Sequence, residues 1–165
     1  MKILGIDPGT TRIGYGLIDG NKSNLKLLDY GTLEIPSGEK LSVVGDKFSE
    51  LLDKFRPNLV AIEKLFFAKN RKTALAVAQT RGAIILKVQE KNLPILEFSP
   101  NEVKLAVASY GNADKKAVAF MVKKFLGVSE LKGYDDASDA LAIAITAAGV
   151  LPRTEPNATS PSRFS

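Results

Sequence analysis

The chain has 165 residues, of which 45% are hydrophobic and 25% charged, so it is long enough to bury the core of one globular domain. It contains neither cysteine nor histidine, which excludes disulfides, thiolate metal sites and Ser/His or Cys/His catalysis. The net charge of +5 favours a polyanionic partner, although lysines scattered over an ordinary surface would give the same value.

The first part of the chain is predicted to form three strands and a helix. The strands are expected at 2–7, 13–19 and 26–35, and the short turns between them predict an antiparallel meander. From 44 to 55 the apolar residues fall at helical spacing, and Pro57 stops that helix.

Strands and helices alternate in the remainder of the chain. Further strands are expected at 59–62 and 94–98, and helices at 72–91, 100–111, 114–126 and 136–148. The last helix is expected to stop at Gly149. Because the strand at 59–62 joins the meander by a crossover, the pattern predicts an α/β fold with a five-stranded mixed sheet flanked by helices.

The domain boundary is predicted near residue 150. Residues 1–150 read as one domain, whereas 151–165 are rich in Pro, Ser, Thr and Asn and are expected to form a disordered tail. No apolar run is long enough to cross a bilayer, and no secretory leader precedes the first strand. We therefore expect a cytoplasmic protein with no membrane association.

Four carboxylates stand where three apolar segments begin or end. Asp7 and Glu63 each close an apolar strand, and Asp136 and Asp139 open the last apolar helix. If strand 59–62 runs parallel to the first strand, Asp7 and Glu63 end at one edge of the sheet, where ligands of α/β proteins bind. Clustered acids need a counter-charge, and hard oxygen ligands select Mg²⁺ or Mn²⁺, a pair of which suits phosphodiester hydrolysis.

Most of these acids also have an ordinary structural interpretation. Asp7 before Pro-Gly is a normal turn residue, and Asp135 and Asp136 can be plain helix caps. Spacing does not choose between Asp135 and Asp136, because each shares a helical face with Asp139. Asp139 interrupts an apolar helix and Glu63 ends an apolar strand, so a functional role explains these two better.

Three blocks of the sequence resemble RuvC-type Holliday-junction resolvases. In family order they are Gly5 to Gly16, Ala61 to Asn70 and Asp136 to Ala144, and the resemblance extends over roughly residues 1–148. It implies an RNase-H-like fold, a homodimer, and two divalent ions per subunit, Mg²⁺ or in its place Mn²⁺. It also implies the branch-migration complex RuvA–RuvB as a partner, and roles in homologous recombination and DNA repair.

The resemblance assigns roles position by position. The catalytic and metal-binding acids fall on Asp7, Glu63, Asp136 and Asp139, which selects Asp136 over Asp135. The aromatic residue that inserts near the junction centre matches Phe66, and two phosphate-contacting lysines match Lys104 and Lys115.

The loop that follows Glu63 independently suits a nucleic-acid surface. Lys69 and Arg71 lie close to Phe66 and Phe67, and cations bind phosphates while an aromatic ring stacks on an unpaired base. We expect Phe66 to be exposed and Phe67 to be buried. No cofactor other than the metal ions is expected.

The preferred function is a structure-selective endonuclease that resolves four-way (Holliday) DNA junctions by symmetric paired incisions. Two-metal hydrolysis would leave 5′-phosphate and 3′-hydroxyl ends, with Lys115 helping to neutralise the developing charge. A two-fold dimer would set two sites against the two-fold symmetric junction. The Ala-rich helix 73–88 is the candidate dimer contact, unless it is simply buried on the sheet.

Two other functions stay open at this point. The segment from Ile6 to Thr11 also looks like the first phosphate loop of actin-like sugar kinases, although those proteins need two such domains. A junction-binding module without catalysis is the third reading, against which the complete set of acids argues.

Overall fold

The computed structural model describes residues 1–21, 23–65, 71–133 and 135–151, and of residues 71 and 72 the backbone only. Its centre is a five-stranded sheet with the strand order β3-β2-β1-β4-β5. The strands are β1 (Lys2–Pro8), β2 (Arg12–Asn21), β3 (Asn24–Glu34), β4 (Leu59–Glu63) and β5 (Ile95–Phe98). β1 pairs antiparallel with β2 and parallel with β4, which confirms the predicted mixed sheet.

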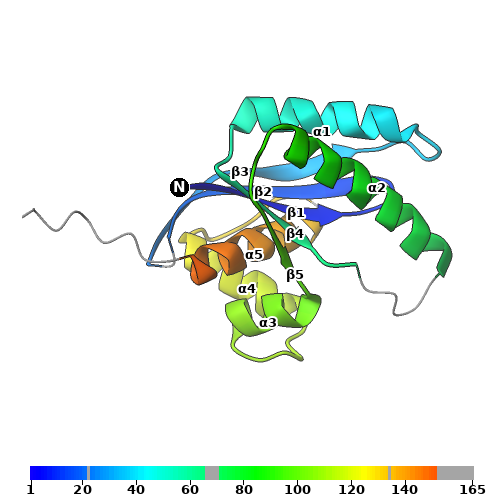
Figure 1. Cartoon of the computed structure of the whole chain (residues 1–165). Helices are drawn as coiled ribbons and strands as arrows, with labels where there is room; N and C mark the ends of the chain where they lie inside the picture. Colours follow the sequence, from blue (N-terminus) through cyan, green and yellow to red (C-terminus); the bar gives the residue numbers. More distant parts are fainter. Residues whose placement is uncertain (22, 66–70, 134, 152–165) are drawn as a thin grey trace, which may run out of the picture.

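Helices cover both faces of the sheet, giving three layers (Figure 1). One face carries α1 (Leu41–Phe55) and α2 (Arg71–Glu90), and the other carries α3 (Pro100–Ala108), α4 (Lys115–Leu126) and α5 (Asp135–Val150). Each strand and helix predicted from the sequence is present, because the apolar period and the capping residues define them locally. Among the described helices, none is both long and apolar enough to span a membrane.

α3 is shorter than predicted. It begins at the expected capping box, in which the Ser99 hydroxyl accepts from the Glu102 N–H and the Glu102 carboxylate accepts from the Ser99 N–H. It ends at Ala108 rather than near Gly111, because Ser109 adopts the left-handed conformation (φ 68°). A C-terminal cap of this kind favours glycine, so the sequence pointed to the wrong residue.

α5 is longer than predicted. It runs through Gly149 to Val150, although Gly149 was expected to end it. The two preceding residues, Ala147 and Ala148, are buried in the core, and tertiary packing of this kind overrides the modest helix propensity of one glycine. The predicted tail from residue 152 onward lies outside the described residues.

The core is divided by the sheet into two apolar clusters, because successive strand residues point to opposite faces. Leu4, Ile6 and Ile62 pack with α1 and α2 on one side, around the fully buried Phe48. On the other side, residues such as Ile3 pack with α3, α4 and α5. This alternation fixes the direction of every side chain in β1 and β4, including the acids at their ends.

α5 approaches the sheet closely over glycines of β1 and β2. A Cβ atom at Gly5 would lie 2.0 Å from the carbonyl oxygen of Ala140, and one at Gly16 would lie 2.6 Å from the Leu141 side chain. Both distances are far below van der Waals contact, so these positions admit no side chain without moving the helix. The glycines thus set the depth at which α5 crosses the strands.

Gly5→Ala is expected to lower the free energy of unfolding by about 1–3 kcal/mol or more, as overpacked cores do. Its physical cause is the collision with the Ala140 carbonyl, a backbone atom that cannot rotate away.

Gly82→Ala is the matched control. Gly82 is an exposed α2 residue with nothing within 4 Å of the new methyl group, and a gain of up to about 1 kcal/mol is expected there. Urea unfolding of both variants measures the difference. Equal stabilities would contradict the close approach.

α2 is only half covered by the rest of the chain. Thr80, Ile84 and Val88 are buried on the side of the helix that faces α1 and the sheet. Leu75 and Leu86 are instead 63% and 53% exposed. The alternative that this helix is simply buried on the sheet is therefore wrong for its outer face.

Candidate active site at the ends of the central strands

Asp7 and Glu63 lie side by side at the carboxyl ends of two parallel strands. Ile6 of β1 is in register with Ile62 of β4, and each acid is the next residue of its strand. Ile3 and Leu59 belong to the apolar cluster on the α5 side, and the acids lie an even number of residues further along, so their side chains point to that same side. The parallel register of β1 and β4 thus confirms the prediction that Asp7 and Glu63 end at the same edge of the sheet.

The first turn of α5 lies over the same place. Gly14 of β2 is in register with Asp7 of β1, and a Cβ atom at Gly14 would lie 2.1 Å from the Asp136 carbonyl oxygen. Asp139 follows one turn later and lines a cavity of about 200 Å³ together with Glu63. Three separate segments thus bring the predicted acids to one corner of the molecule.

The pKa values of Asp7 and Glu63 are both raised, by burial and by the neighbouring acids. The pKa of Asp7 is raised from 3.8 to about 7, chiefly by burial and then by the charges of Glu63, Asp139 and Asp136, with Lys115 opposing. The pKa of Glu63 is raised by burial and by Asp139. Burial without a counter-charge disfavours the ionised form of a carboxyl, and neighbouring acids add to that cost.

Two cations contact the helix acids. The Arg12 guanidinium Nε lies 3.1 Å from Oδ2 of Asp136, and the Lys115 Nζ lies 3.1 Å from Oδ2 of Asp139. The carboxylate of Asp139 in turn raises the pKa of Lys115. Sequence reasoning missed Arg12, since no local pattern links residues 124 positions apart.

The donor set of this corner fits a hard divalent ion. It consists of carboxylate oxygens, which Mg²⁺ and Mn²⁺ prefer, and a cation there would relieve the repulsion that raises the pKa of Asp7. In the described part of the chain, no three acidic side chains are arranged to ligate one ion as they stand.

Asp135 faces a different environment from Asp136. It is exposed and lines a separate cavity with Lys123 and Tyr30. Asp136 instead packs against Gly14 of β2, the partner of Asp7, and its charge is among those that raise the pKa of Asp7. The fold thus distinguishes two neighbours that helical spacing left equivalent.

Among the residues predicted to bind DNA, two lysines are described. Lys104 of α3 and Lys115 at the start of α4 line the cavity that contains Glu63 and Asp139. Phe66 and Lys69 lie outside the described residues, as does Phe67, and the structure describes only the backbone of Arg71. The expectations for these aromatic and basic side chains stay predictions.

A family model, a curated relative and a solved structure similar to this chain all carry the same family name, RuvC. The family model described as crossover junction endodeoxyribonuclease RuvC matches residues 3–147. A Fusobacterium nucleatum protein of that name is 44% identical over 150 residues, covering 88% of this chain and 79% of its own. The structure of Thermus thermophilus RuvC in complex with a Holliday junction superposes with a TM-score of 0.81 at 33% identity, covering 88% of this chain and 92% of that one. A yeast mitochondrial Holliday junction resolvase shares the fold, with a TM-score of 0.66 at 18% identity over 88% of this chain and 77% of that one.

Proposed function

This chain belongs to the RuvC family of crossover junction endodeoxyribonucleases, and we propose that it resolves four-way DNA junctions with the acids gathered at the ends of β1 and β4. The observation that carries the assignment of the site is geometric: Asp7 and Glu63 end two strands that pair in register, and the first turn of α5, which carries Asp136, packs over Gly14 beside Asp7. Structural packing alone gives no reason to place four acids there.

Members of this nuclease family depend on divalent metal ions, and we propose that Asp7, Glu63, Asp136 and Asp139 hold two Mg²⁺ ions, with Mn²⁺ able to replace them. When bound, such ions supply an activated water and charge neutralisation at the leaving 3′-oxygen, so the products are 5′-phosphate and 3′-hydroxyl ends. The protein contributes a rigid frame. The register of β1 and β4 orients two of the acids, and the glycine contacts of α5 orient the other two.

Lys104 and Lys115 are proposed to receive the DNA backbone. Both lysines line the same cavity as Glu63 and Asp139, so a phosphate bound there would lie close to cations as well as to the acids. Lys115 is bonded to Asp139 at 3.1 Å, which places its charge where negative charge develops during hydrolysis. Phe66, Lys69 and Arg71 are proposed to extend this surface towards the junction centre.

The test of the function is cleavage of a synthetic four-way junction beside a linear duplex of the same sequence, with and without Mg²⁺. Paired symmetric incisions of the junction that require the metal are expected. Binding without incision would indicate the junction-binding module without catalysis. ATP binding in calorimetry would revive the actin-like phosphotransferase, which the family match over residues 3–147 otherwise leaves without support.

Lys104→Ala is expected to weaken junction binding and to lower the slope of log affinity against log salt by about 1, because each lysine–phosphate contact releases roughly one counterion. Lys91→Ala is the matched control. Lys91 carries the same charge but lies between α2 and the start of β5, at the far end of the strands from the acids. Affinities across a salt series in EDTA measure both slopes, and equal slopes would remove Lys104 from the DNA path.

We also propose a homodimer that presents two sites to the two arms of the junction. The exposed face of α2, which carries Leu75 and Leu86, is the candidate contact. Light scattering that shows a monomer at micromolar concentration would contradict it. Following the family, the enzyme is proposed to act in the cytoplasm with RuvA–RuvB in recombination and DNA repair.

A further inference from the structure

The main-chain carbonyl of Glu63 cannot obtain its hydrogen bond from β1. The N–H of Lys64 donates to the Phe98 carbonyl of β5 at 2.8 Å, so Lys64 faces β5 and Glu63 faces β1. Continuing the register of Ile6 with Ile62 by one residue sets Asp7 opposite Glu63, and in a parallel pair the donor for the Glu63 carbonyl would then be the next residue of β1. That residue is Pro8, which has no N–H.

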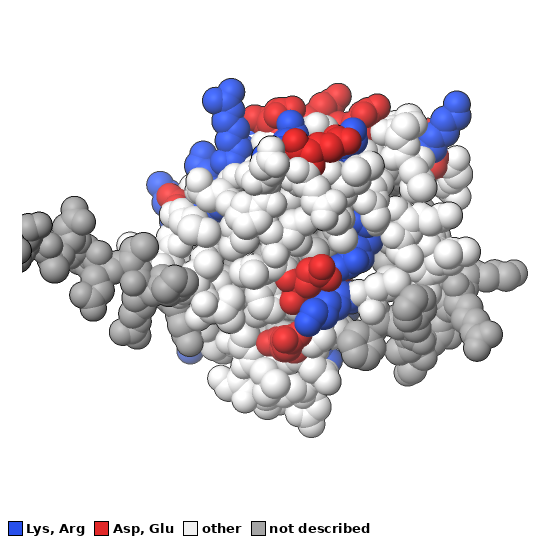
Figure 2. Space-filling view, viewed as in Figure 1, with Lys and Arg blue, Asp and Glu red and all other residues white. Residues whose placement is uncertain are grey.

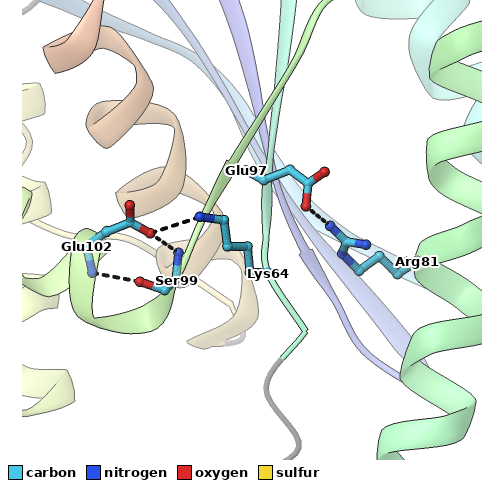
Figure 3. Close-up of polar contacts among 5 residues, drawn as sticks. All are labelled: Lys64, Arg81, Glu97, Ser99 and Glu102. Atoms are coloured by element: carbon cyan, nitrogen blue, oxygen red, sulfur yellow. Dashed lines mark hydrogen bonds and ion pairs between the residues drawn. The ribbon is translucent and has the colours of Figure 1, made fainter.

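Arg81 of α2 supplies the missing donor. Its Nε donates to the Glu63 carbonyl oxygen at 3.0 Å. Its Nη2 pairs with the carboxylate of Glu97 on β5, and Figure 3 shows this second contact. The Arg81 side chain is only 16% exposed, so this contact is shielded from competing water. One planar guanidinium therefore joins α2, β4 and β5 at the residue that carries a proposed metal ligand.

A second ion pair, between Lys64 and Glu102, lies at the end of β4 and is weaker than the contacts of Arg81. Lys64 pairs at 3.5 Å with Glu102, whose carboxylate also caps α3 through the Ser99 N–H (Figure 3). Both side chains of that pair are about half exposed, and exposed ion pairs contribute little. Figure 2 shows charges of both signs alternating down the middle of this face. Arg81, which is largely buried, is the stronger anchor of the two.

We propose that Arg81 is a positioning residue: by holding the Glu63 carbonyl and Glu97 together, it fixes the backbone at the end of β4 and hence the direction of the Glu63 carboxylate. This inference rests on the proposed function. Glu63 is the last residue of its strand, and its carbonyl has no donor from β1, so the hydrogen bond of this carbonyl comes from α2. A displacement of about 1 Å in a reacting or ligating group is enough to cost about a hundredfold in rate.

The experiment compares Arg81→Met and Arg81→Lys with the control Lys87→Met. Lys87 is a cation of the same helix, 23% exposed, that pairs with Asp46 and Glu90 and makes no contact with β4 among the described contacts. Calorimetry with Mg²⁺ alone, on DNA-free protein, is the first readout. Junction affinity in EDTA and the Mg²⁺ dependence of cleavage are the others.

Arg81→Met is expected to weaken Mg²⁺ binding and to shift cleavage to higher Mg²⁺ by about 10–100-fold, the usual effect of removing a group that orients a ligand. Its junction affinity in EDTA is expected to stay within about twofold of the parent. Arg81→Lys should be intermediate, because an ammonium cannot reproduce the two-pronged contact. Lys87→Met should match the parent in all three readouts.

Parental Mg²⁺ affinity in Arg81→Met, or an equal loss in Lys87→Met, would overturn the proposal. Should Arg81→Met fail to fold, Glu97→Gln takes its place, with a several-fold weakening of Mg²⁺ binding expected and parental affinity again overturning it. Glu63→Gln separates this inference from the proposed function. If that variant keeps parental cleavage and Mg²⁺ affinity, Glu63 is no ligand and the site assignment itself fails, whatever Arg81 does.

Discussion

Replacing Asp7 with Asn is expected to abolish junction cleavage while leaving junction binding intact. Asp7 ends the strand that pairs with β4 and lies beside the residue over which the first turn of α5 packs, so both the strand acid Glu63 and the helix acids are its neighbours. The amide has nearly the same shape but lacks the charge and one anionic oxygen that a divalent ion requires. We expect a loss of at least about a hundred- to a thousandfold, the scale seen when one preorganised charge-stabilising group is removed.

The measurement is single-turnover cleavage of a synthetic junction in Mg²⁺, set beside junction affinity in EDTA. Asp135→Asn is the matched control, because it makes the same change of charge on an exposed acid that lines a different cavity. That control is expected to cut at close to the parental rate. Cleavage by Asp7→Asn at the parental rate would show that the site has been assigned to the wrong residues.

The sequence predicts the frame of this site well because the frame depends on local signals. Two apolar strands each end in an acid, and one crossover is enough to make strands of this kind parallel. The choice of Asp136 over Asp135, in contrast, cannot be made from local sequence signals. Both residues satisfy the same helical spacing, and only the packing of α5 over Gly14 places one of them beside Asp7.

The cations around the acids could not be predicted in the same way. Arg12 meets Asp136 across 124 residues, a contact that depends on how α5 crosses β2. Arg81 does leave a trace in the sequence, since it is the one charged residue between Lys72 and Lys87 of an otherwise apolar and small-residue helix. An isolated charge in such a helix indicates a partner, but it does not say that the partner is a backbone carbonyl.

The pH dependence of stability provides the second large effect. In EDTA, Asp7→Asn is expected to be more stable than the parent at pH 8, by an amount that shrinks towards zero at pH 4. The pKa of Asp7 is about 7 in the folded chain against 3.8 ordinarily, so between these values the folded state binds more protons than the unfolded state. The contribution of Asp7 to stability is thus present below pH 4 and is lost as the pH rises through 7.

A difference of about three pKa units corresponds to about 4 kcal/mol at 1.4 kcal/mol per unit, which sets the upper limit of the effect. Urea unfolding of the parent and Asp7→Asn at several pH values in EDTA measures it. Because other groups titrate in both proteins, only the difference between the two curves reports on Asp7. Asp135→Asn should run parallel to the parent, and a parallel curve for Asp7→Asn would contradict the raised pKa.

Adding Mg²⁺ should narrow the difference in stability between the two proteins at pH 8. The ion binds the folded parent through ionised acids, and a ligand at a hundred times its dissociation constant stabilises a protein by about 2.7 kcal/mol. Asp7→Asn lacks one of those charges and should gain much less. The repulsion that destabilises the metal-free chain is also what makes the corner attractive to a divalent ion. A gain from Mg²⁺ that is equal in the two proteins would therefore place the ion elsewhere, even if the pH dependence were as expected.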